Sequence, residues 1–320
     1  MADSGSKSAQ PGGNGRRGLR IEEEHLHSMF KFWKKSKPDS KLAATSALAP
    51  AREEFAVTAS VQTDVGCHRE INEDSSTFIE PGSGELLSAR GRLVVVADGM
   101  GGHSAGEVAS RIAVDVISRV YYDTPGDPVS ALRTSFIQAN REIHQSSTED
   151  QARKGMGTTC TALVLRNGTA LAAHVGDSRL YLVRGGQIYL MTEDHSAVME
   201  LVKRGLLTLA EARHHPDKNV ILRALGSHRD IEISVWDEPL PIRGGDRFLL
   251  CSDGLYDLVE DNEIMEAVLG GDAHTACSGL ITLAKDRGGY DNITVAVVGI
   301  GVDGRLEHDI KQTREVGVVS

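Results

Sequence analysis

The sequence predicts an α+β fold in which helices cover a sandwich of two antiparallel sheets. Strand-like apolar runs recur along most of the chain, two-residue turn signals join several of them, and helical segments occur in pairs between them. At 320 residues, the chain can bury a substantial core without disulfides. Its four cysteines are far apart and form no CxxC pair, which gives no support to a zinc ribbon or a thioredoxin-like motif.

The first 54 residues have the composition of a disordered leader, because they are rich in Ser, Gly, Lys and Ala and show little periodicity. Within them, the segment Met29 to Lys37 (MFKFWKKSK) mixes aromatic residues with lysines. It could contact a partner or an anionic membrane surface, or it could be a solvated tail. We expect a leader at 1–54, a folded domain at 55–303 and a C-terminal tail at 304–320.

The folded domain begins with a strand. From Phe55, apolar and polar residues alternate with the period of a strand that buries one face. Asn167-Gly168 and Gly185-Gly186 are turn signals of antiparallel hairpins, so we expect much of the sheet structure to be antiparallel. The predicted strands cover residues 55–63, 92–97, 160–166, 169–175, 178–183, 187–191, 231–235, 247–251 and 293–300.

The helices are expected in two pairs. An apolar stripe from Ala105 to Val120 predicts the first helix, and a stripe from Leu132 to Ile143 predicts the second. Two more helices are expected at 262–269 and 274–286. No internal repeat is visible in the sequence.

The charge balance and hydropathy of the chain exclude some classes of function. The chain carries 45 acidic and 35 basic residues, a net charge of −10. An acidic domain repels nucleic acid phosphates, so we expect no nucleic acid partner, although ordinary solubility charge explains the same surplus. No apolar run approaches the ~20 residues of a membrane-spanning helix, and the N-terminus is too polar for a signal peptide. We expect a cytoplasmic monomer without a transmembrane segment.

Carboxylates gather at turns and strand ends. Three aspartates directly follow apolar strand-like runs, and a buried aspartate is costly unless it is paired. A single Asp-Gly pair could be only a turn, but the recurrence favours a shared cation, and oxygen ligands favour Mg²⁺, Mn²⁺ or Ca²⁺ over zinc. Without a side chain, Gly99 could bring its carbonyl close to such an ion. The clusters are Asn72-Glu73-Asp74, Asp98-Gly99, Gly176-Asp177, Asp253-Gly254 with Asp257, and Asp291-Asn292.

These clusters lie in segments that together resemble the PPM family of metal-dependent protein phosphatases, the type 2C group, and particularly its bacterial members. The resemblance covers roughly residues 55–301 and leaves out the leader. The matching segments, in the order of the family, are TDVGCHREINED (63–74), VVVADGMGGH (94–103), GTT (157–159), HVGDSRLY (174–181), LLCSDGLYD (249–257) and DNITV (291–295).

The resemblance implies a four-layer α-β-β-α sandwich with two metal ions, Mn²⁺ or Mg²⁺, in a cleft at the sheet edges. In that family pattern Asp98 would bridge both ions. Asp253 and Asp291 would bind one of them, and Glu73 and the Gly99 carbonyl would bind the other.

The resemblance implies further roles around this centre. Asp74 is expected beside it as a supporting metal-site residue. A third, weaker ion would lie at Asp177 together with Asp253 or Asp257. Arg69 matches the arginine that binds substrate phosphate, for which a planar guanidinium is well suited.

The implied activity is hydrolysis of phosphoserine and phosphothreonine in proteins by a metal-activated water, opposing a Ser/Thr kinase in signalling. Two ions about 3.5–4 Å apart can lower the pKa of a shared water and neutralise phosphoryl oxygens. Many eukaryotic relatives have a histidine after the Asp-Gly, whereas this chain has Met100. The acid for the leaving oxygen is therefore left open between a water and His103.

Three other motifs resemble functional sites. Cys160 and Arg166 have the spacing of a cysteine-phosphatase loop, but the apolar TALVL between them predicts a strand. The glycine run 99–106 fits neither nucleotide-loop pattern. His214 and His215 lack accompanying metal-ligand spacing and fall in a segment, 195–230, that resembles the substrate-selecting flap of the family.

Two other function classes stay open. One is a binding module that has lost catalysis, which the presence of the bridging and phosphate-binding residues disfavours. The other is a phosphatase dedicated to one small phosphoserine regulatory protein in a partner-switching pathway.

Overall fold

The computed structural model describes residues 55–101 and 105–301. The predicted leader 1–54, with its basic-aromatic segment, and the predicted tail 304–320 lie outside the described residues. His103 also lies outside them.

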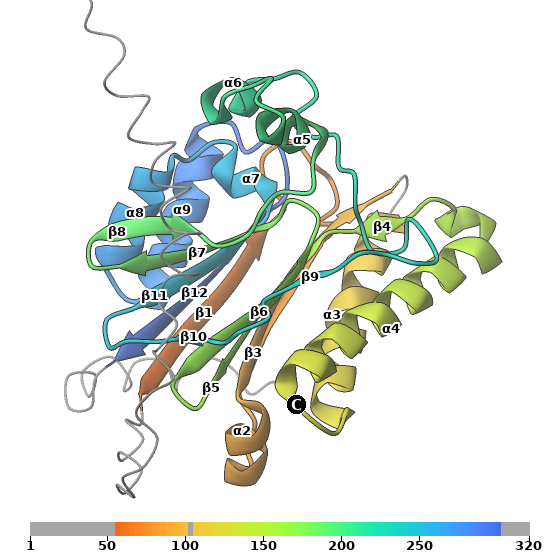
Figure 1. Ribbon diagram of the computed structural model, residues 1–320. Helices are drawn as coiled ribbons and strands as arrows, with labels where there is room; N and C mark the ends of the chain where they lie inside the picture. Colours follow the sequence, from red (N-terminus) through yellow and green to blue (C-terminus); the bar gives the residue numbers. More distant parts are fainter. Residues whose placement is uncertain (1–54, 102–104, 302–320) are drawn as a thin grey trace, which may run out of the picture. The chain divides into compact units, whose positions relative to one another are not determined.

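The first sheet has the strand order β1-β12-β11-β7-β8 and is antiparallel throughout. Its outer strand β1 pairs along its full length with β12, the last described strand of the chain. The two ends of the folded region therefore pair with each other at one edge of this sheet (Figure 1). Its strands are β1 (Ala56–Asp64), β12 (Ile293–Gly301), β11 (Arg247–Cys251), β7 (Arg179–Arg184) and β8 (Gln187–Leu190).

The second sheet has the order β10-β6-β5-β3-β2, with β4 added to β3 and β9 added to β6. All of its described pairings are also antiparallel. Its strands are β10 (Leu240–Pro241), β6 (Thr169–Val175), β5 (Cys160–Arg166), β3 (Arg92–Met100), β2 (Asp74–Ile79), β4 (Gly157–Thr158) and β9 (Ser234–Val235).

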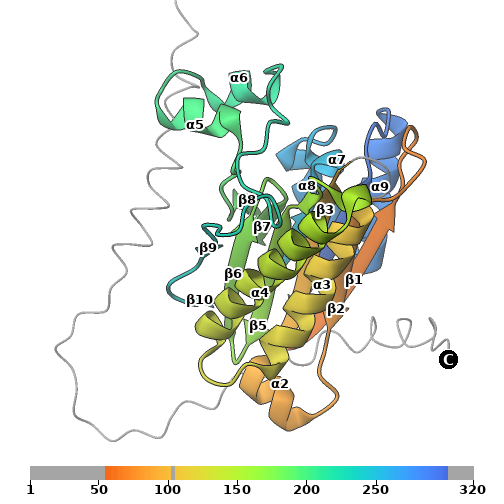
Figure 2. The same ribbon diagram turned by 90° about the vertical axis from the view of Figure 1, so that its right-hand side faces the viewer.

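Helices cover the outer faces of both sheets. Long helices α3 and α4 lie side by side over the second sheet, as Figure 2 shows, and α8 and α9 lie behind the first sheet. Asp127 caps α4 by accepting hydrogen bonds from the amides of Val129 and Ser130. The helices are α2 (Gly84–Arg90), α3 (Ala105–Asp123), α4 (Pro128–Glu149), η1 (Gln151–Arg153), α5 (Ala197–Lys203), α6 (Leu209–Arg213), α7 (Asp253–Tyr256), α8 (Asp261–Leu269) and α9 (Ala273–Asp286).

Three apolar layers hold the four structural layers together. In β3, Val94 and Val96 pack between the sheets, while Leu93, Val95 and Ala97 pack under the α3–α4 layer. A third cluster fills the space between the first sheet and the α8–α9 layer. Because the central strands are buried on both faces, their sequences are continuous apolar runs without polar alternation. The predicted α+β sandwich is confirmed.

The predicted hairpins are present. Asn167 and Gly168 join β5 to β6 with φ values of 49° and 76°, and Gly185 and Gly186 join β7 to β8 with φ values of 60° and 74°. Two successive positive φ values are typical of the tight turn that matches strand twist. Both turns therefore fix the register of their hairpins.

Some elements differ from the sequence prediction. The expected strand at 231–235 is reduced to the two residues of β9, because only these pair with β6. Strand β2 and the short helices α2 and α7 were not predicted. In β2, half-buried Ser and Thr residues replace the apolar alternation that marks a strand.

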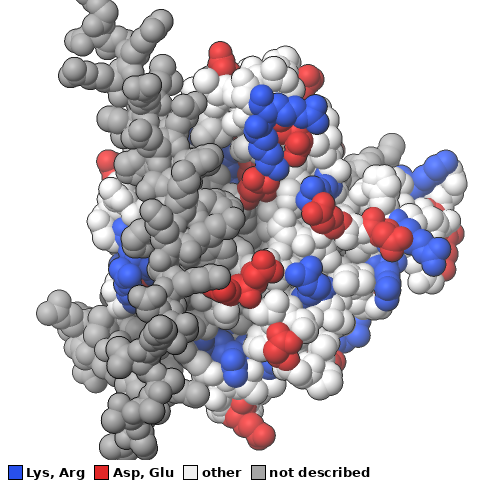
Figure 3. Space-filling model, in the orientation of Figure 1, with Lys and Arg blue, Asp and Glu red and all other residues white. Residues whose placement is uncertain are grey.

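The charged side chains are interspersed on the face that Figure 3 shows, with Lys and Arg next to Asp and Glu and not gathered into one basic surface. Among the described residues, no helix is long and apolar enough to cross a membrane.

Candidate metal centre at the strand ends

The antiparallel topology brings carboxylates from distant parts of the chain to one end of the sandwich. Asp74 begins β2 and is in register with Asp98 near the end of β3. In the first sheet, Asp253 follows the end of β11, and Asp291 precedes the start of the adjacent antiparallel strand β12. In an antiparallel pair, one strand ends at the edge where its neighbour begins. The two aspartates of each pair of strands therefore lie at the same edge of their sheet.

Asp74 connects the two sheets at this end. Its Oδ2 accepts hydrogen bonds from Ser252 Oγ at 2.8 Å and from Thr294 Oγ1 at 2.6 Å. Its Oδ1 is buried and has no hydrogen-bond partner in the described part of the chain. Burial raises the pKa of Asp74 to about 6, against the lowering effect of these two hydroxyls. Asp74 thus presents one satisfied and one unsatisfied oxygen.

Asn292 fixes the loop that carries the N-terminal carboxylates. Its Nδ2 donates to the carbonyls of Val65 and Ile71 at 3.0 and 3.1 Å, and its Oδ1 accepts from the Glu73 amide at 2.7 Å. Asn292 is only 4% exposed. No role for Asn292 was predicted from the sequence. A signal was present, because it is a polar residue directly ahead of a largely apolar strand.

The backbone around Asp98 is held from the opposite side by the GTT segment. The Asp98 carbonyl accepts hydrogen bonds from the Thr158 hydroxyl at 2.8 Å and from the Thr159 amide at 2.9 Å. The Asp98 amide donates to Thr159 Oγ1 at 3.0 Å. These bonds use only the backbone atoms of Asp98 and do not engage its carboxylate.

Gly99 and Gly106 allow three segments to touch behind the centre. A Cβ on Gly99 would lie 2.1 Å from the Gly106 carbonyl oxygen and 2.5 Å from the Glu73 carbonyl oxygen. A Cβ on Gly106 would lie 2.6 Å from Glu73 Oε1. Glycine is therefore required here for close packing between the loop, the strand end and helix α3. The structure gives Gly99 this role in addition to the carbonyl role expected for it.

The carboxylates at this edge perturb each other. Burial raises the pKa values of Asp98 and Asp253 well above their ordinary range, and the negative charges of neighbouring carboxylates raise them further. Burial also raises the pKa of Glu73, which lies beside the Gly106 amide at the start of α3. The Oδ1 atoms of Asp177 and Asp253 are buried without a hydrogen-bond partner among the described residues. Unpaired buried oxygens of like charge are stabilised by a cation.

This donor set fits hard divalent cations. All of the side-chain donors are carboxylate oxygens, which Mg²⁺ and Mn²⁺ accept and zinc sites rarely use alone. No three His, Cys, Asp or Glu side chains in the described ranges are grouped as a preformed metal cage.

Arg69 lies on the solvent-exposed side of the centre, paired with Asp291. Its Nη2 donates to Asp291 Oδ2 at 2.7 Å, and the two side chains are 49% and 34% exposed. The hydrogen bond that Arg69 donates to Asp291 raises the pKa of Arg69, and the charges of Glu73 and Asp253 raise it as well. The guanidinium is fully charged, accessible to solvent and directed at the carboxylate cluster. These properties suit it to bind an anion brought to the cluster.

Asp177 and Asp257 form a second acidic group on the side of the α5–α6 segment. Burial, together with the charge of Asp194, raises the pKa of Asp177 to about 7. Asp194 is itself paired with Arg179, whose Nη2 donates at 2.7 Å. Lys218 Nζ lies 2.5 Å from Asp257 Oδ2. This group therefore has basic partners close to its acids.

The α5–α6 segment is attached to α7 by basic side chains. Arg213 Nη2 donates to the carbonyls of Tyr256 and Val259 at 2.7 and 3.1 Å, next to the Lys218–Asp257 pair. His214 is exposed, and His215 Nδ1 accepts the Asp217 amide. The histidine pair thus contacts its own loop and takes no part in the carboxylate centre.

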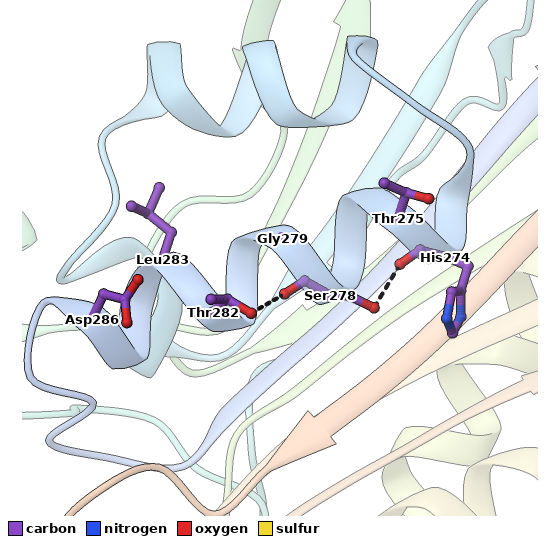
Figure 4. Close-up of a pocket in the computed structure, with 7 residues that line it drawn as sticks. All are labelled: His274, Thr275, Ser278, Gly279, Thr282, Leu283 and Asp286. Carbon is purple, nitrogen blue, oxygen red and sulfur yellow. Dashed lines mark hydrogen bonds between the residues drawn. The ribbon is translucent and has the colours of Figure 1, made fainter.

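A surface cavity of about 590 Å³ lies elsewhere, along the outer side of α9. Figure 4 shows that the hydroxyls of Ser278 and Thr282 are hydrogen-bonded to carbonyls of the same helix. None of the carboxylates of the centre lines this cavity. All of the residues that line this cavity belong to α9.

The cysteine-phosphatase spacing is structural. Cys160 and Arg166 are the two ends of β5, so no anion-binding loop lies between them. Burial raises the pKa of the Cys160 thiol far above its ordinary value. A buried neutral thiol in a strand is no nucleophile.

Comparisons with known proteins agree with this geometry. Residues 70–275 match the family model described as protein phosphatase 2C. The serine/threonine protein phosphatase PstP of Mycobacterium tuberculosis is 36% identical over 273 residues, 84% of this chain and 49% of PstP. The chain thus spans about half the length of PstP. Protein phosphatase PhpP of Streptococcus pneumoniae is 38% identical over 247 residues, 75% of this chain and 96% of PhpP.

A solved structure is similar as well. The catalytic domain of serine/threonine protein phosphatase PstP, in complex with two manganese ions, superposes with a TM-score of 0.66 at 36% identity. The match covers 77% of this chain and 99% of that domain.

Proposed function

Because the chain belongs to the protein phosphatase 2C family, we propose that it hydrolyses phosphoserine and phosphothreonine in proteins. The observation that carries this proposal is that carboxylates from both sheets gather at one end of the sandwich. The exposed Arg69 lies beside them and pairs with Asp291. Relatives named serine/threonine phosphatases support the substrate class.

We propose that Asp98 bridges two divalent cations, with Asp253 and Asp291 on one and Glu73 and the Gly99 carbonyl on the other. Support comes from the unpartnered buried oxygens and from the two manganese ions of the similar PstP domain. Asp74 would hold the site together, because it joins the sheets through Ser252 and Thr294. When bound, such ions supply Lewis acidity that lowers the pKa of water and neutralises phosphoryl oxygens.

The residues of the chain orient the phosphoester. Arg69 binds the phosphate after exchanging its contact with Asp291 for the incoming anion, which the 49% exposure of its side chain permits. Asp98, with its backbone fixed by Thr158 and Thr159, keeps its carboxylate in place during turnover. Met100 has no proton to give to the leaving oxygen, so that proton comes from water or from His103.

We propose the wider setting as follows. The phosphatase domain covers 55–303, acts as a monomer in the cytoplasm and opposes a Ser/Thr kinase in signalling. Manganese is supported by the PstP domain, and Mg²⁺ suits the same oxygen donors. A third ion would use Asp177 with Asp253 or Asp257, which is supported by the unpartnered Asp177 Oδ1. The described cysteines, which are all free, fit a reducing compartment.

Phosphate release from a phosphothreonine peptide tests the proposal. The assay compares Mn²⁺, Mg²⁺ and chelator, and compares Asp98→Asn with the unaltered protein. We expect turnover that needs the metal and is lost in the variant. A folded protein that releases no phosphate with any divalent cation would instead indicate a binding module without catalysis.

A further inference from the structure

An exposed aromatic pair lies next to the phosphate-binding arginine. The rings of His68 and Tyr290 are stacked with their centroids 5.1 Å apart and their planes tilted by 30°. His68 precedes Arg69 in the chain and Tyr290 precedes Asp291, so the stack and the Arg69–Asp291 ion pair connect the same two loops side by side.

The two loops are held rigidly below these side chains. The Cys67 amide donates to the Gly289 carbonyl at 2.7 Å, and Asn292 bonds the carbonyls of Val65 and Ile71. A Cβ on Gly66 would lie 2.2 Å from the Asp291 carbonyl oxygen, so the two backbones are in contact. The aromatic pair therefore has a fixed position relative to Arg69 and loses little conformational entropy when it binds a ligand.

Two large hydrophobic side chains of these loops are exposed to solvent. Tyr290 is 62% exposed, and Ile71, on the His68 loop, is 44% exposed. Single exposed apolar side chains are ordinary on a protein surface. Here, however, Ile71, Tyr290 and His68 lie on the same two loops as the Arg69–Asp291 ion pair.

We infer that His68, Tyr290 and Ile71 form a docking ledge for an apolar side chain next to the phosphorylated residue of the substrate. This inference rests on the proposed function. With its phosphate on Arg69, a substrate in extended conformation advances about 3.3 Å per residue, so a near neighbour of the phosphorylated residue lies over the ledge. Burying an apolar side chain on the Tyr290 ring favours such substrates over those with charged neighbours.

The experiment compares phosphothreonine peptides that differ only in the residues beside the phosphothreonine: leucine, glutamate or lysine. For the unaltered protein with Mn²⁺, we expect kcat/KM to be at least about tenfold higher for the leucine peptide than for the other two, mainly through KM. Tyr290→Ala should reduce this ratio to near one, and Tyr290→Phe should keep it because the ring is retained. Leu269→Ala, at an exposed leucine at the end of α8 that is 46% exposed, is the matched control and should also keep it.

Peptide affinity without turnover separates the two proposals. Anisotropy of the fluorescein-labelled leucine peptide in chelator should show at least about threefold weaker binding for Tyr290→Ala than for Tyr290→Phe. Preferential binding of the leucine peptide without hydrolysis under any metal would refute the proposed function and retain the ledge. Equal kcat/KM for all three peptides, a preference for lysine, or an unchanged ratio in Tyr290→Ala would overturn the ledge even with full phosphatase activity.

Discussion

The two ends of strand β11 carry buried aspartate oxygens in opposite circumstances. Asp246, just before the strand, is 1% exposed and fully partnered: Arg184 donates to both of its oxygens at 2.8 and 2.6 Å, and the Arg243 amide donates at 2.7 Å. Asp253, two residues after the strand, has a buried Oδ1 without a partner in the described residues. Burial and neighbouring carboxylates raise the pKa of Asp253 well above its ordinary value.

The difference separates a structural acid from a ligand-binding acid. A buried carboxylate with a basic partner is neutralised within the fold, and losing the partner is costly because it leaves a buried charge uncompensated. A buried carboxylate among other carboxylates destabilises the folded protein until a cation binds. Charge balance around each aspartate, and not burial alone, thus indicates where the chemistry lies.

The same substitution at the two ends of β11 should therefore have opposite effects. Asp253→Asn removes a repelled charge, so we expect an unchanged or higher melting temperature in chelator and at least about a 10³-fold loss of kcat. Asp246→Asn leaves Arg184 without its counter-charge, so we expect a loss of about 3–5 kcal/mol in the free energy of unfolding. Urea denaturation and phosphopeptide turnover measure both. A destabilised Asp253→Asn with normal turnover would place the chemistry elsewhere.

Glycine provides the next contrast, between a crowded and an open position. In Gly99→Ala the new Cβ would lie 2.1 Å from the Gly106 carbonyl oxygen, so we expect a loss of about 3 kcal/mol or more and weaker Mn²⁺ binding. In Gly279→Ala, within α9, the Cβ meets nothing within 4 Å. That variant should gain about 0.5–1 kcal/mol, because alanine favours helix. Thermal unfolding and Mn²⁺ titration test the pair, and equal effects at both positions would contradict the packing role of Gly99.

The sequence predicted most of the fold because its signals are local. Hairpin turns such as Asn167-Gly168 require two positive φ values, and the long apolar stripes of α3 and α4 have one helical period. Strand β2 escaped prediction because its half-buried Ser and Thr residues give no apolar alternation. Helix α7 is a single turn, too short for a periodic pattern to be read from it.

The residue types of the site could be predicted from the sequence, whereas most of the hydrogen bonds and ion pairs around them could not. Aspartates after apolar strands, such as Asp98, can be recognised from sequence because their burial needs a reason. The hydrogen bonds from Ser252 and Thr294 to Asp74 depend on how two sheets pack, which no local pattern encodes. The partners of Arg69 and Asp257 were likewise not predictable, because each joins segments far apart in the chain.

The pH dependence of stability should show the unbalanced charge at Asp177. Its folded-state pKa is raised to about 7 from 3.8, so the folded protein holds a proton that the unfolded chain releases. The resulting stabilisation is present at acid pH and is lost as the pH rises from about 4 to about 7. In chelator, Asp177→Asn should therefore gain on the order of 2–4 kcal/mol relative to the unaltered protein between pH 4.5 and pH 8.

Urea denaturation at both pH values measures this gain. Asp286→Asn, at an exposed aspartate on α9, is the control for replacing a surface carboxylate. A pH-independent difference for Asp177→Asn would mean that its charge is compensated in the folded protein.

The smallest effect is expected where an acid of the second group already has a basic partner. Lys218 and Asp257 are half-buried, with side chains 33% and 21% exposed, so Lys218→Met should cost no more than about 1 kcal/mol of stability. Removing this positive charge from beside Asp257 should tighten the weakest Mn²⁺ site about three- to tenfold, because the ammonium and a cation compete for the same carboxylate. Calorimetric Mn²⁺ titration compares it with Lys203→Met, whose lysine pairs with Glu193 and Glu200 instead. Identical Mn²⁺ affinities in the two variants would show that Asp257 is a purely structural acid, like Asp246, and would confine cation binding to the carboxylates that lack a basic partner.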